Sequence, residues 1–238
     1  MSPCDSCHAG CCRAFAVPVT GADVLRIERD LGSSFWEIAI RWADPEGAIA
    51  KGQAPHFRFA DDPRTPFVIC LRHEESVLHA GTTKCRFLVE RPVDNEHPIG
   101  VARCGIYESR PSACRAFPTR LGSAGDLVIL HDVPQSGRVD DHPAYRLCPH
   151  PWETSEVDPI QSAADLVVGR YEMAFFRQLA EAWNRRQQSM DVFPDFIRLV
   201  YSQRVQRAAA DEESRDADDG PRLLKFPVRT REAQIKAA

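Results

Sequence analysis

Two short helices are predicted near the beginning of the chain. The first follows the candidate caps Thr20 and Asp23 and runs to about Leu31, because apolar residues recur along one face of such a helix. These residues are Val24, Leu25, Ile27 and Leu31. The second runs from Ser34 to Trp42, where an Asp-Pro pair ends it.

Between residues 55 and 150 the pattern changes to short strands. Residues 56–59 alternate between apolar and polar, residues 61–64 have turn composition, and residues 67–71 form an apolar run, so the three segments predict a β-hairpin. Further strands are predicted at 86–89, 99–103 and 127–130. Most cysteines beyond the first cluster lie at the ends of these strands, where loops converge and sites usually form.

The C-terminal part is predicted to be helical. A long helix runs from about Asp158-Pro159 to about Gln188, and a shorter one from Phe193 to Ala209. Residues 211–220 hold six acids against one arginine, a composition that buries too little surface to fold. We therefore expect one cysteine-cluster domain over residues 1–209, with its ligands in 1–150 and its helical part in 158–209. A charged, disordered tail covers 210–238. The fold class is α+β, a small irregular cysteine-rich metal-binding domain of short strands and packed helices.

Composition narrows the class of protein. The chain has 238 residues, of which 43% are hydrophobic and 27% charged, as in ordinary globular proteins. Its net charge of -4 argues against general nucleic-acid binding, which needs a basic excess. No signal peptide and no apolar run of the ~20 residues that span a bilayer occur. We expect a cytoplasmic protein with no membrane partner. Whether it binds another protein stays open.

The nine cysteines carry the chemistry. In a reducing compartment they are not expected to form disulfides. Cys70 lies in the apolar run 67–71 and is interpreted as a packed core residue. The first cluster is different, because it places four cysteines within nine residues with few apolar neighbours: Cys4, Cys7, Cys11 and Cys12.

A Cys-x-x-Cys pair is a natural chelate, used by structural zinc sites and by iron–sulfur clusters. Gly10 supplies the positive φ that the returning loop needs. Adjacent side chains diverge, so either one of Cys11 and Cys12 is a ligand and the other packs, or the two serve neighbouring metals. The first cluster is not self-sufficient, and further ligands come from a second group of cysteines later in the chain.

Other chemistries are weaker. His8, His142 and His150 lie near cysteines, but exposed histidines are the more ordinary interpretation. His73 and His79 flank two glutamates without an H-E-x-x-H motif, so we interpret them as solvated. The chain has no G-x-S-x-G, G-x-G-x-x-G or phosphate-binding loop.

The order of the cysteines resembles a known family. C-x-x-C-x-x-x-C-C is followed by C-x-F-L at Cys85, by C-x-I-Y-x-x-R-P-x-x-C-R-x-F-P from Cys104, and by a late cysteine. This order resembles the YkgJ-type cysteine-cluster family, the zinc- or iron-chelating domain with the CxxCxxCC signature, over roughly residues 1–150. It is also similar to the cysteine-rich part of flagellin lysine N-methylases. Three residues separate Cys7 from Cys11, where the signature has two. The resemblance implies eight metal ligands: Cys4, Cys7, Cys11, Cys12, Cys85, Cys104, Cys114 and Cys148.

Eight cysteines admit two four-coordinate sites, or one iron–sulfur cluster with extra thiols. Adjacent thiols and dispersed ligands favour an iron–sulfur cluster or iron centre, with zinc as the alternative, since sulfur ligation does not separate the two. Arginines beside the cysteines are expected to offset thiolate charge; they are Arg86, Arg103, Arg110 and Arg115. The alternative functions are a flagellin-type protein lysine N-methyltransferase or its accessory, and a metal-delivery or assembly factor. Whether the protein is an enzyme stays open.

Overall fold

The computed structural model describes residues 9–51, 53–92, 94–95, 101–129 and 153–218, with side chains described up to residue 211. Three of the predicted ligands, Cys4, Cys7 and Cys148, therefore lie outside the described residues. The chain divides into a large unit, Met1–Arg198, and a small one, Leu199–Ala238. As far as the structure describes it, the small unit is the remainder of the last helix. Every contact discussed below lies within the large unit.

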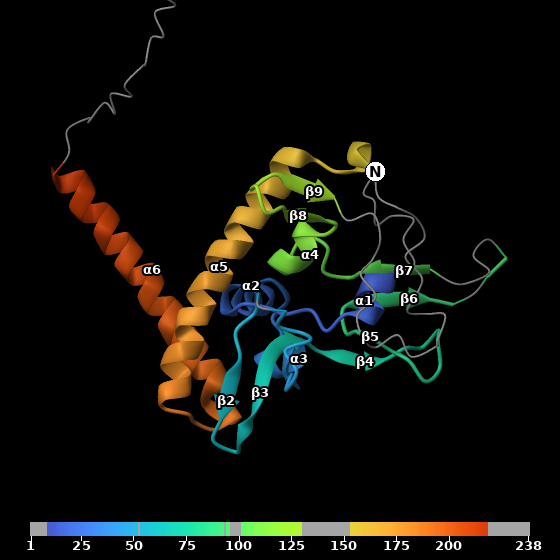
Figure 1. The fold of residues 1–238 in the computed structure, drawn as a ribbon, viewed down its shortest axis with the longest axis horizontal. Helices are drawn as coiled ribbons and strands as arrows, with labels where there is room; N and C mark the ends of the chain where they lie inside the picture. The colour runs from blue at the N-terminus through green and yellow to red at the C-terminus, as the bar shows by residue number, and fades with distance from the viewer. Residues whose placement is uncertain (1–8, 52, 93, 96–100, 130–152, 219–238) are drawn as a thin grey trace, which may run out of the picture. The chain divides into compact units, whose positions relative to one another are not determined.

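The largest sheet has three antiparallel strands in the order β1-β3-β2 (Figure 1). Its strands are β1 (Ala39–Ala43), β2 (Phe57–Phe59) and β3 (Asp62–Leu71). Phe57 pairs with Phe67, so β2 and β3 form the predicted hairpin. The last five residues of β3 are all buried, as expected for the central strand of a covered sheet.

The two helices predicted near the beginning of the chain differ in how well the prediction matches the structure. α2 (Gly21–Leu31) begins at Thr20, whose hydroxyl accepts a hydrogen bond from the Asp23 N–H, and this confirms the predicted helix. α3 covers only Phe35–Ile38. The predicted helix to Trp42 is wrong beyond Ile38, because the next five residues pair with Phe67–Leu71 as β1. Pairing with a central strand outweighs local helix propensity here.

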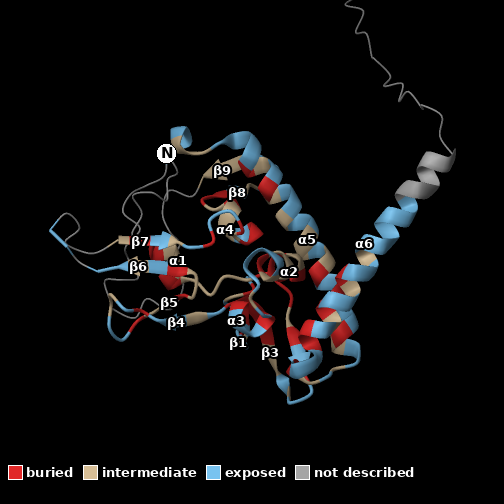
Figure 2. Cartoon of the chain, turned by 180° about the vertical axis from the view of Figure 1, so that it is seen from behind, coloured by how far each residue is buried: buried red, intermediate tan, exposed pale blue. Residues whose placement is uncertain are grey.

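An aromatic core joins the sheet to the long helix α5 (Pro159–Arg185). The Phe57 ring lies 4.9 Å from that of Phe176, and the Trp183 ring 4.9 Å from that of Phe193, centroid to centroid. The Trp183 indole N–H also donates to the carbonyl of Arg58 at 2.8 Å. Figure 2 shows buried residues gathered where α2, α3, β1 and β3 meet.

The predicted C-terminal helices are both present, with different ends. Asp158 caps α5 by accepting from the N–H groups of Ile160 and Gln161, as its Asp-Pro sequence predicts. α6 covers Phe193–Asp218 and so continues nine residues past the predicted end at Ala209. Residues 210–218 include Ala, Glu and Arg, which have high helix propensity.

In the described residues, the rest of the large unit consists of short elements, and these carry five of the cysteines. Helices α1 (Gly10–Ala14) and α4 (Ser112–Ala116) accompany three two-stranded sheets and two 3-10 turns, Thr154–Glu156 and Met190–Val192. The sheets pair β4 (His73–Glu75) with β5 (Thr83–Cys85), β6 (Leu88–Arg91) with β7 (Val101–Cys104), and β8 (Thr119–Leu121) with β9 (Leu127–Ile129). The strand predicted at 86–89 is displaced, because Arg86 and Phe87 form a turn before β6. The mixed α+β class is confirmed.

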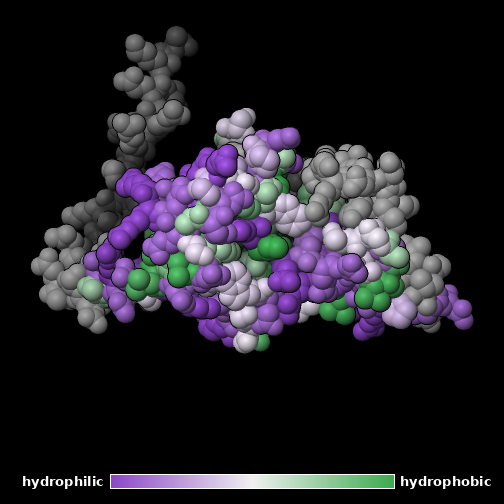
Figure 3. Space-filling view, turned by 90° about the horizontal axis from the view of Figure 1, so that it is seen from below, coloured by the Kyte–Doolittle hydropathy of each residue, from purple (hydrophilic) through white to green (hydrophobic). Residues whose placement is uncertain are grey.

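On the face shown in Figure 3, most of the surface is hydrophilic and the hydrophobic areas form separate small patches. Among the helices that the structure describes, none is both long and apolar enough to cross a membrane.

Candidate metal centre

α1 presents Cys11 and Cys12. Ala9 adopts a left-handed φ of 61°, and the Cys12 N–H donates to the Ala9 carbonyl at 3.1 Å, which starts the helix. The predicted positive φ at Gly10 is therefore wrong, because the turn is made one residue earlier and Gly10 already belongs to the helix. The two sulfur atoms lie 3.9 Å apart. The adjacent side chains thus stay close instead of diverging to opposite sides.

Cys85 ends β5 and Cys104 ends β7, and these strands belong to different two-stranded sheets. Leu88 of β6 pairs with Cys104, and the Gly105 N–H donates to the Phe87 carbonyl at 2.7 Å. The turn that follows Cys85 therefore lies beside the turn that follows Cys104. Each sulfur accepts a backbone hydrogen bond from two residues further on, Cys85 from Phe87 and Cys104 from Ile106. Such N–H donors stabilise the thiolate form that binds metals.

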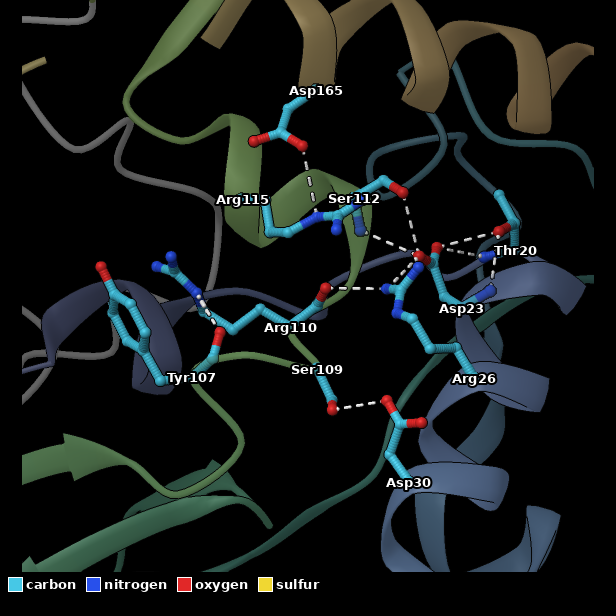
Figure 4. Close-up of polar contacts among 10 residues, drawn as sticks. All are labelled: Thr20, Asp23, Arg26, Asp30, Tyr107, Ser109, Arg110, Ser112, Arg115 and Asp165. Atoms are coloured by element: carbon cyan, nitrogen blue, oxygen red, sulfur yellow. Dashed lines mark hydrogen bonds and ion pairs between the residues drawn. The ribbon is translucent and has the colours of Figure 1, made fainter. Parts of the chain in front are cut away.

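Cys114 lies on α4, and α4 is held by the N-terminal end of α2 (Figure 4). The Asp23 carboxylate accepts from the Ser112 N–H at 2.9 Å and from the Ser112 hydroxyl at 3.0 Å. Arg26, paired with Asp23, donates to the Arg110 carbonyl at 2.8 Å. These buried and half-buried contacts fix the segment that precedes Cys114.

Five cysteines form one electrostatic neighbourhood, which means that they lie close enough to one another for their charges to interact. A hydrogen bond with Cys11, burial, and the nearby Cys85 and Cys114 all raise the pKa of Cys12. Burial raises the pKa of Cys114 well above its usual range, and Cys85, Cys11 and Cys104 raise it further. Burial raises the pKa of Cys85 to about 12, with Cys104 and Cys11 adding to the effect. The structure thus brings together Cys11, Cys12, Cys85, Cys104 and Cys114.

Cys70 does not belong to this group. Its side chain is 0% exposed on β3 and packs with Ala50, Ala54 and Val68. Burial is the main cause that raises its pKa, and Asp44 adds to the effect. Cys70 is the packed core residue that the apolar run indicates.

The donor set suits soft metals. Thiolates select zinc, iron and iron–sulfur clusters, whereas Mg²⁺ and Ca²⁺ take oxygen ligands. Within the described ranges, no three Cys, His, Asp or Glu side chains converge tightly enough to enclose a metal ion. The raised pKa values of Cys12, Cys85, Cys104 and Cys114 favour protonated thiols, and thiols ligate only after losing the proton. The described cysteines are thus near one another, but their side chains are not arranged around a single metal position.

Two cations lie close to the sulfurs. Arg110 lowers the pKa of Cys104, against the larger effect of burial, and its guanidinium lies 3.7 Å from the Tyr107 ring centroid. Lys84, only 4% exposed, lowers the pKa of the adjacent Cys85, likewise against burial. Arg110 was expected in this role from its sequence position. Arg86 and Arg115 pair with acids, Glu37 and Asp165, each at 3.4 Å, and Arg103 is exposed. Lys84 also pairs with an acid, Glu74, at 2.7 Å.

The buried ion pair between α1 and β6 was not predicted from the sequence. Arg13 and Glu90 pair with side chains 1% and 3% exposed. Burial opposes ionisation of Glu90, but hydrogen bonds from Ser76, Arg13 and the Val77 N–H outweigh it and lower the pKa of the carboxyl. No sequence pattern indicates that Arg13, beside two cysteines, pairs with Glu90 in a distant strand.

The fold and this gathering of cysteines define a thiol-rich site suited to a soft metal. The chain belongs to the CxxCxxCC family, whose model matches residues 3–135, more than half of the chain, and is described as "Putative zinc- or iron-chelating domain". The match ends before Cys148. A search of curated proteins and a search of solved structures each found no match.

Proposed function

We propose that this protein binds an iron–sulfur cluster or an iron centre through clustered cysteine thiolates, with zinc as the alternative metal. The observation that carries the proposal is the gathering of five cysteines from α1, β5, β7 and α4 in one electrostatic neighbourhood. Cys11, Cys12, Cys85, Cys104 and Cys114 are the proposed ligands from the described part of the chain. Cys4, Cys7 and Cys148 are proposed to complete the set.

Two features favour iron–sulfur over zinc. The adjacent thiols of Cys11 and Cys12, with sulfurs 3.9 Å apart, and the spread of the ligands over four elements suit a multinuclear centre better than a single tetrahedral zinc. Backbone N–H groups also point at the sulfurs of Cys85 and Cys104, and hydrogen bonds to cluster sulfurs are one means by which proteins tune such clusters. When bound, the cluster would supply one-electron redox chemistry, and zinc would supply structural cross-linking only.

The charge of the ligands supports a cationic centre. Several thiolates in one buried neighbourhood repel one another unless a metal neutralises them. Lys84 and Arg110 offset part of this charge. Removing the metal returns the protons to the sulfurs, so the metal affinity should fall as the pH falls.

Anaerobic isolation of the full chain tests the choice of metal. An iron–sulfur protein will be brown, with visible sulfur-to-iron charge-transfer absorption and acid-labile sulfide in proportion to iron. A colourless protein with stoichiometric zinc and no sulfide excludes the iron–sulfur assignment and leaves metal binding itself standing. We place the protein in the cytoplasm, where thiols stay reduced.

The same preparation separates a resident centre from a cargo. A resident metal should leave slowly when a chelator is added, whereas a delivery factor should release it quickly to a chelator or to a recipient protein. Titration with S-adenosylmethionine tests the methyltransferase alternative. Saturable binding by the metal-loaded protein would support that alternative, and its absence would remove it.

A further inference from the structure

A closed polar network lies behind the helix that carries Cys11 and Cys12. Arg13 follows these cysteines in α1, and its side chain points inward, only 1% exposed. One guanidinium nitrogen of Arg13 donates to the Ser76 hydroxyl at 2.9 Å, and the other pairs with the Glu90 carboxylate. The Ser76 hydroxyl in turn donates to Glu90 at 2.7 Å. The three side chains therefore hold one another in a triangle.

Glu90 also ties down the backbone beside Ser76. Its second carboxylate oxygen accepts from the Val77 N–H at 2.7 Å and from the Leu78 N–H at 3.3 Å. The His79 N–H donates to the Ser76 hydroxyl at 3.1 Å. The network thus fixes the loop 76–79 as well as two side chains.

Each element joined by this network leads to a different cysteine. Arg13 belongs to α1, with Cys11 and Cys12. The loop at Ser76 is bonded to Thr82, just before β5, which ends at Cys85. Glu90 lies on β6, whose first residue, Leu88, pairs with Cys104. The network therefore joins α1 to two segments that lie next to the cysteine-bearing strands β5 and β7, without touching a sulfur atom.

A contribution to the stability of the fold does not by itself account for this buried network. A buried ion pair is often no more stabilising than a well-packed apolar pair of similar volume, because both charges lose their hydration. What the planar guanidinium adds is direction, since its forked donors fix the angle between the partners. A fixed angle is useful where α1 must present two adjacent sulfurs to the same centre as Cys85 and Cys104.

We propose that Arg13 is a positioning residue: held by Ser76 and Glu90, it sets the place of Cys11 and Cys12 relative to Cys85 and Cys104 in the metal centre. This inference rests on the proposed metal binding. It assigns the geometry of the centre to a group that is not itself a ligand, in the way that outer partners orient metal ligands.

The test compares metal release with stability in the full chain, isolated anaerobically with its native metal. The Arg13→Met/Glu90→Met variant removes both charges and keeps an apolar filling. We expect a lower urea midpoint, because the Ser76 hydroxyl and the Val77 N–H lose their acceptor. We also expect release to a chelator about 10- to 100-fold faster and, for bound iron, an altered optical spectrum. The matched control, Arg198→Met, removes an arginine from the half-exposed Arg198–Glu28 pair and should release metal at the wild-type rate.

A folded double variant with the wild-type spectrum and release rate would overturn the inference while leaving the proposed function intact. If the double variant does not unfold cooperatively, Arg13→Lys decides the question, because it keeps the charge and loses the fork. Faster release from folded Arg13→Lys supports the inference, and unchanged release overturns it. A wild-type protein isolated without any metal would instead remove the proposed function, and this inference with it.

Discussion

Asp23 accepts a hydrogen bond from the Ser112 N–H at 2.9 Å although the two residues lie 89 positions apart in the chain. The same carboxylate caps α2 through Thr20 and pairs with Arg26. One buried acid therefore joins the start of α2 to the start of α4, the helix that carries Cys114 (Figure 4). The scaffold of the candidate centre extends well beyond the cysteines.

Replacing this acid should damage both the fold and the site. Asp23→Ala leaves buried donors of Thr20 and Ser112 without an acceptor, and we expect a loss of about 1–3 kcal/mol in the free energy of unfolding. Metal release should also accelerate, because α4 loses its anchor. Urea denaturation and chelator kinetics measure the two effects. Asp30→Ala is the control, since Asp30 lies at the surface, where it accepts a hydrogen bond from the Ser109 side chain and pairs with Arg29. Equal effects of the two substitutions would contradict the role given to Asp23.

The two kinds of cysteine should separate under substitution. Cys114→Ala removes a proposed ligand and should lower the metal-to-protein ratio and, because metal binding is coupled to folding, the stability. Cys70→Ala removes a packed core side chain, and we expect a loss of about 1 kcal/mol with unchanged metal content. Elemental analysis of both variants gives the comparison. Retained metal in Cys114→Ala, or lost metal in a folded Cys70→Ala, would break the assignment.

Gly105 permits the close approach of the two cysteine-bearing turns. A Cβ added there would lie 2.9 Å from a Val89 methyl carbon and 3.0 Å from the Phe87 carbonyl oxygen. Gly105→Ala should therefore force the turns apart, cost about 1–3 kcal/mol in stability, and weaken metal retention. The Gly105→Ala/Val89→Ala variant relieves the side-chain clash but not the backbone clash, so we expect it to recover part of the loss. Wild-type stability and metal retention in Gly105→Ala would show that the close approach is not required.

Acid sensitivity should include a contribution from Asp44, remote from the cysteines. Burial opposes its ionisation, but hydrogen bonds from the Ile49 N–H, His56 and the Ala50 N–H outweigh burial and lower the pKa of the carboxyl. A carboxyl with a lowered pKa stabilises the fold above its unfolded pKa of about 3.9, and this contribution disappears as the pH falls through the lower folded value.

We therefore expect Asp44→Asn to cost about 1–3 kcal/mol at pH 7, where Asp44 is ionised and fully bonded. The difference from the wild type should shrink as the pH falls below about 4. Urea denaturation of both proteins across this range isolates the effect, because metal loss in acid is common to both. A difference that stays constant or grows in acid would contradict the lowered pKa.

Local patterns predicted the elements whose reasons are local. The alternation at 56–59 and the apolar run at 67–71 gave the hairpin, and Thr20 and Asp158 gave the starts of α2 and α5. The segment after Ile38 was mistaken for helix because its partner strand lies about thirty residues away, and no local signal reports that pairing.

The candidate site was predictable as a set of cysteines and not as a structure. The order of the motifs indicated that Cys11, Cys12, Cys85, Cys104 and Cys114 belong together, and they do lie in one neighbourhood. The groups that hold them were missed, because Arg13 and Glu90, or Asp23 and Ser112, are paired only by the fold. Lys84 was also missed, although it stands directly before Cys85 in the sequence.

The metal content of the full chain tests the central claim most directly. Elemental analysis of anaerobically isolated wild-type protein should find at least one equivalent of iron or zinc per chain. The triple variant Cys11→Ala/Cys85→Ala/Cys114→Ala, expressed and isolated in parallel, should hold almost none. Wild-type protein that is folded and free of both metals, or a triple variant that retains the wild-type amount, would contradict the claim that these cysteines form a metal centre.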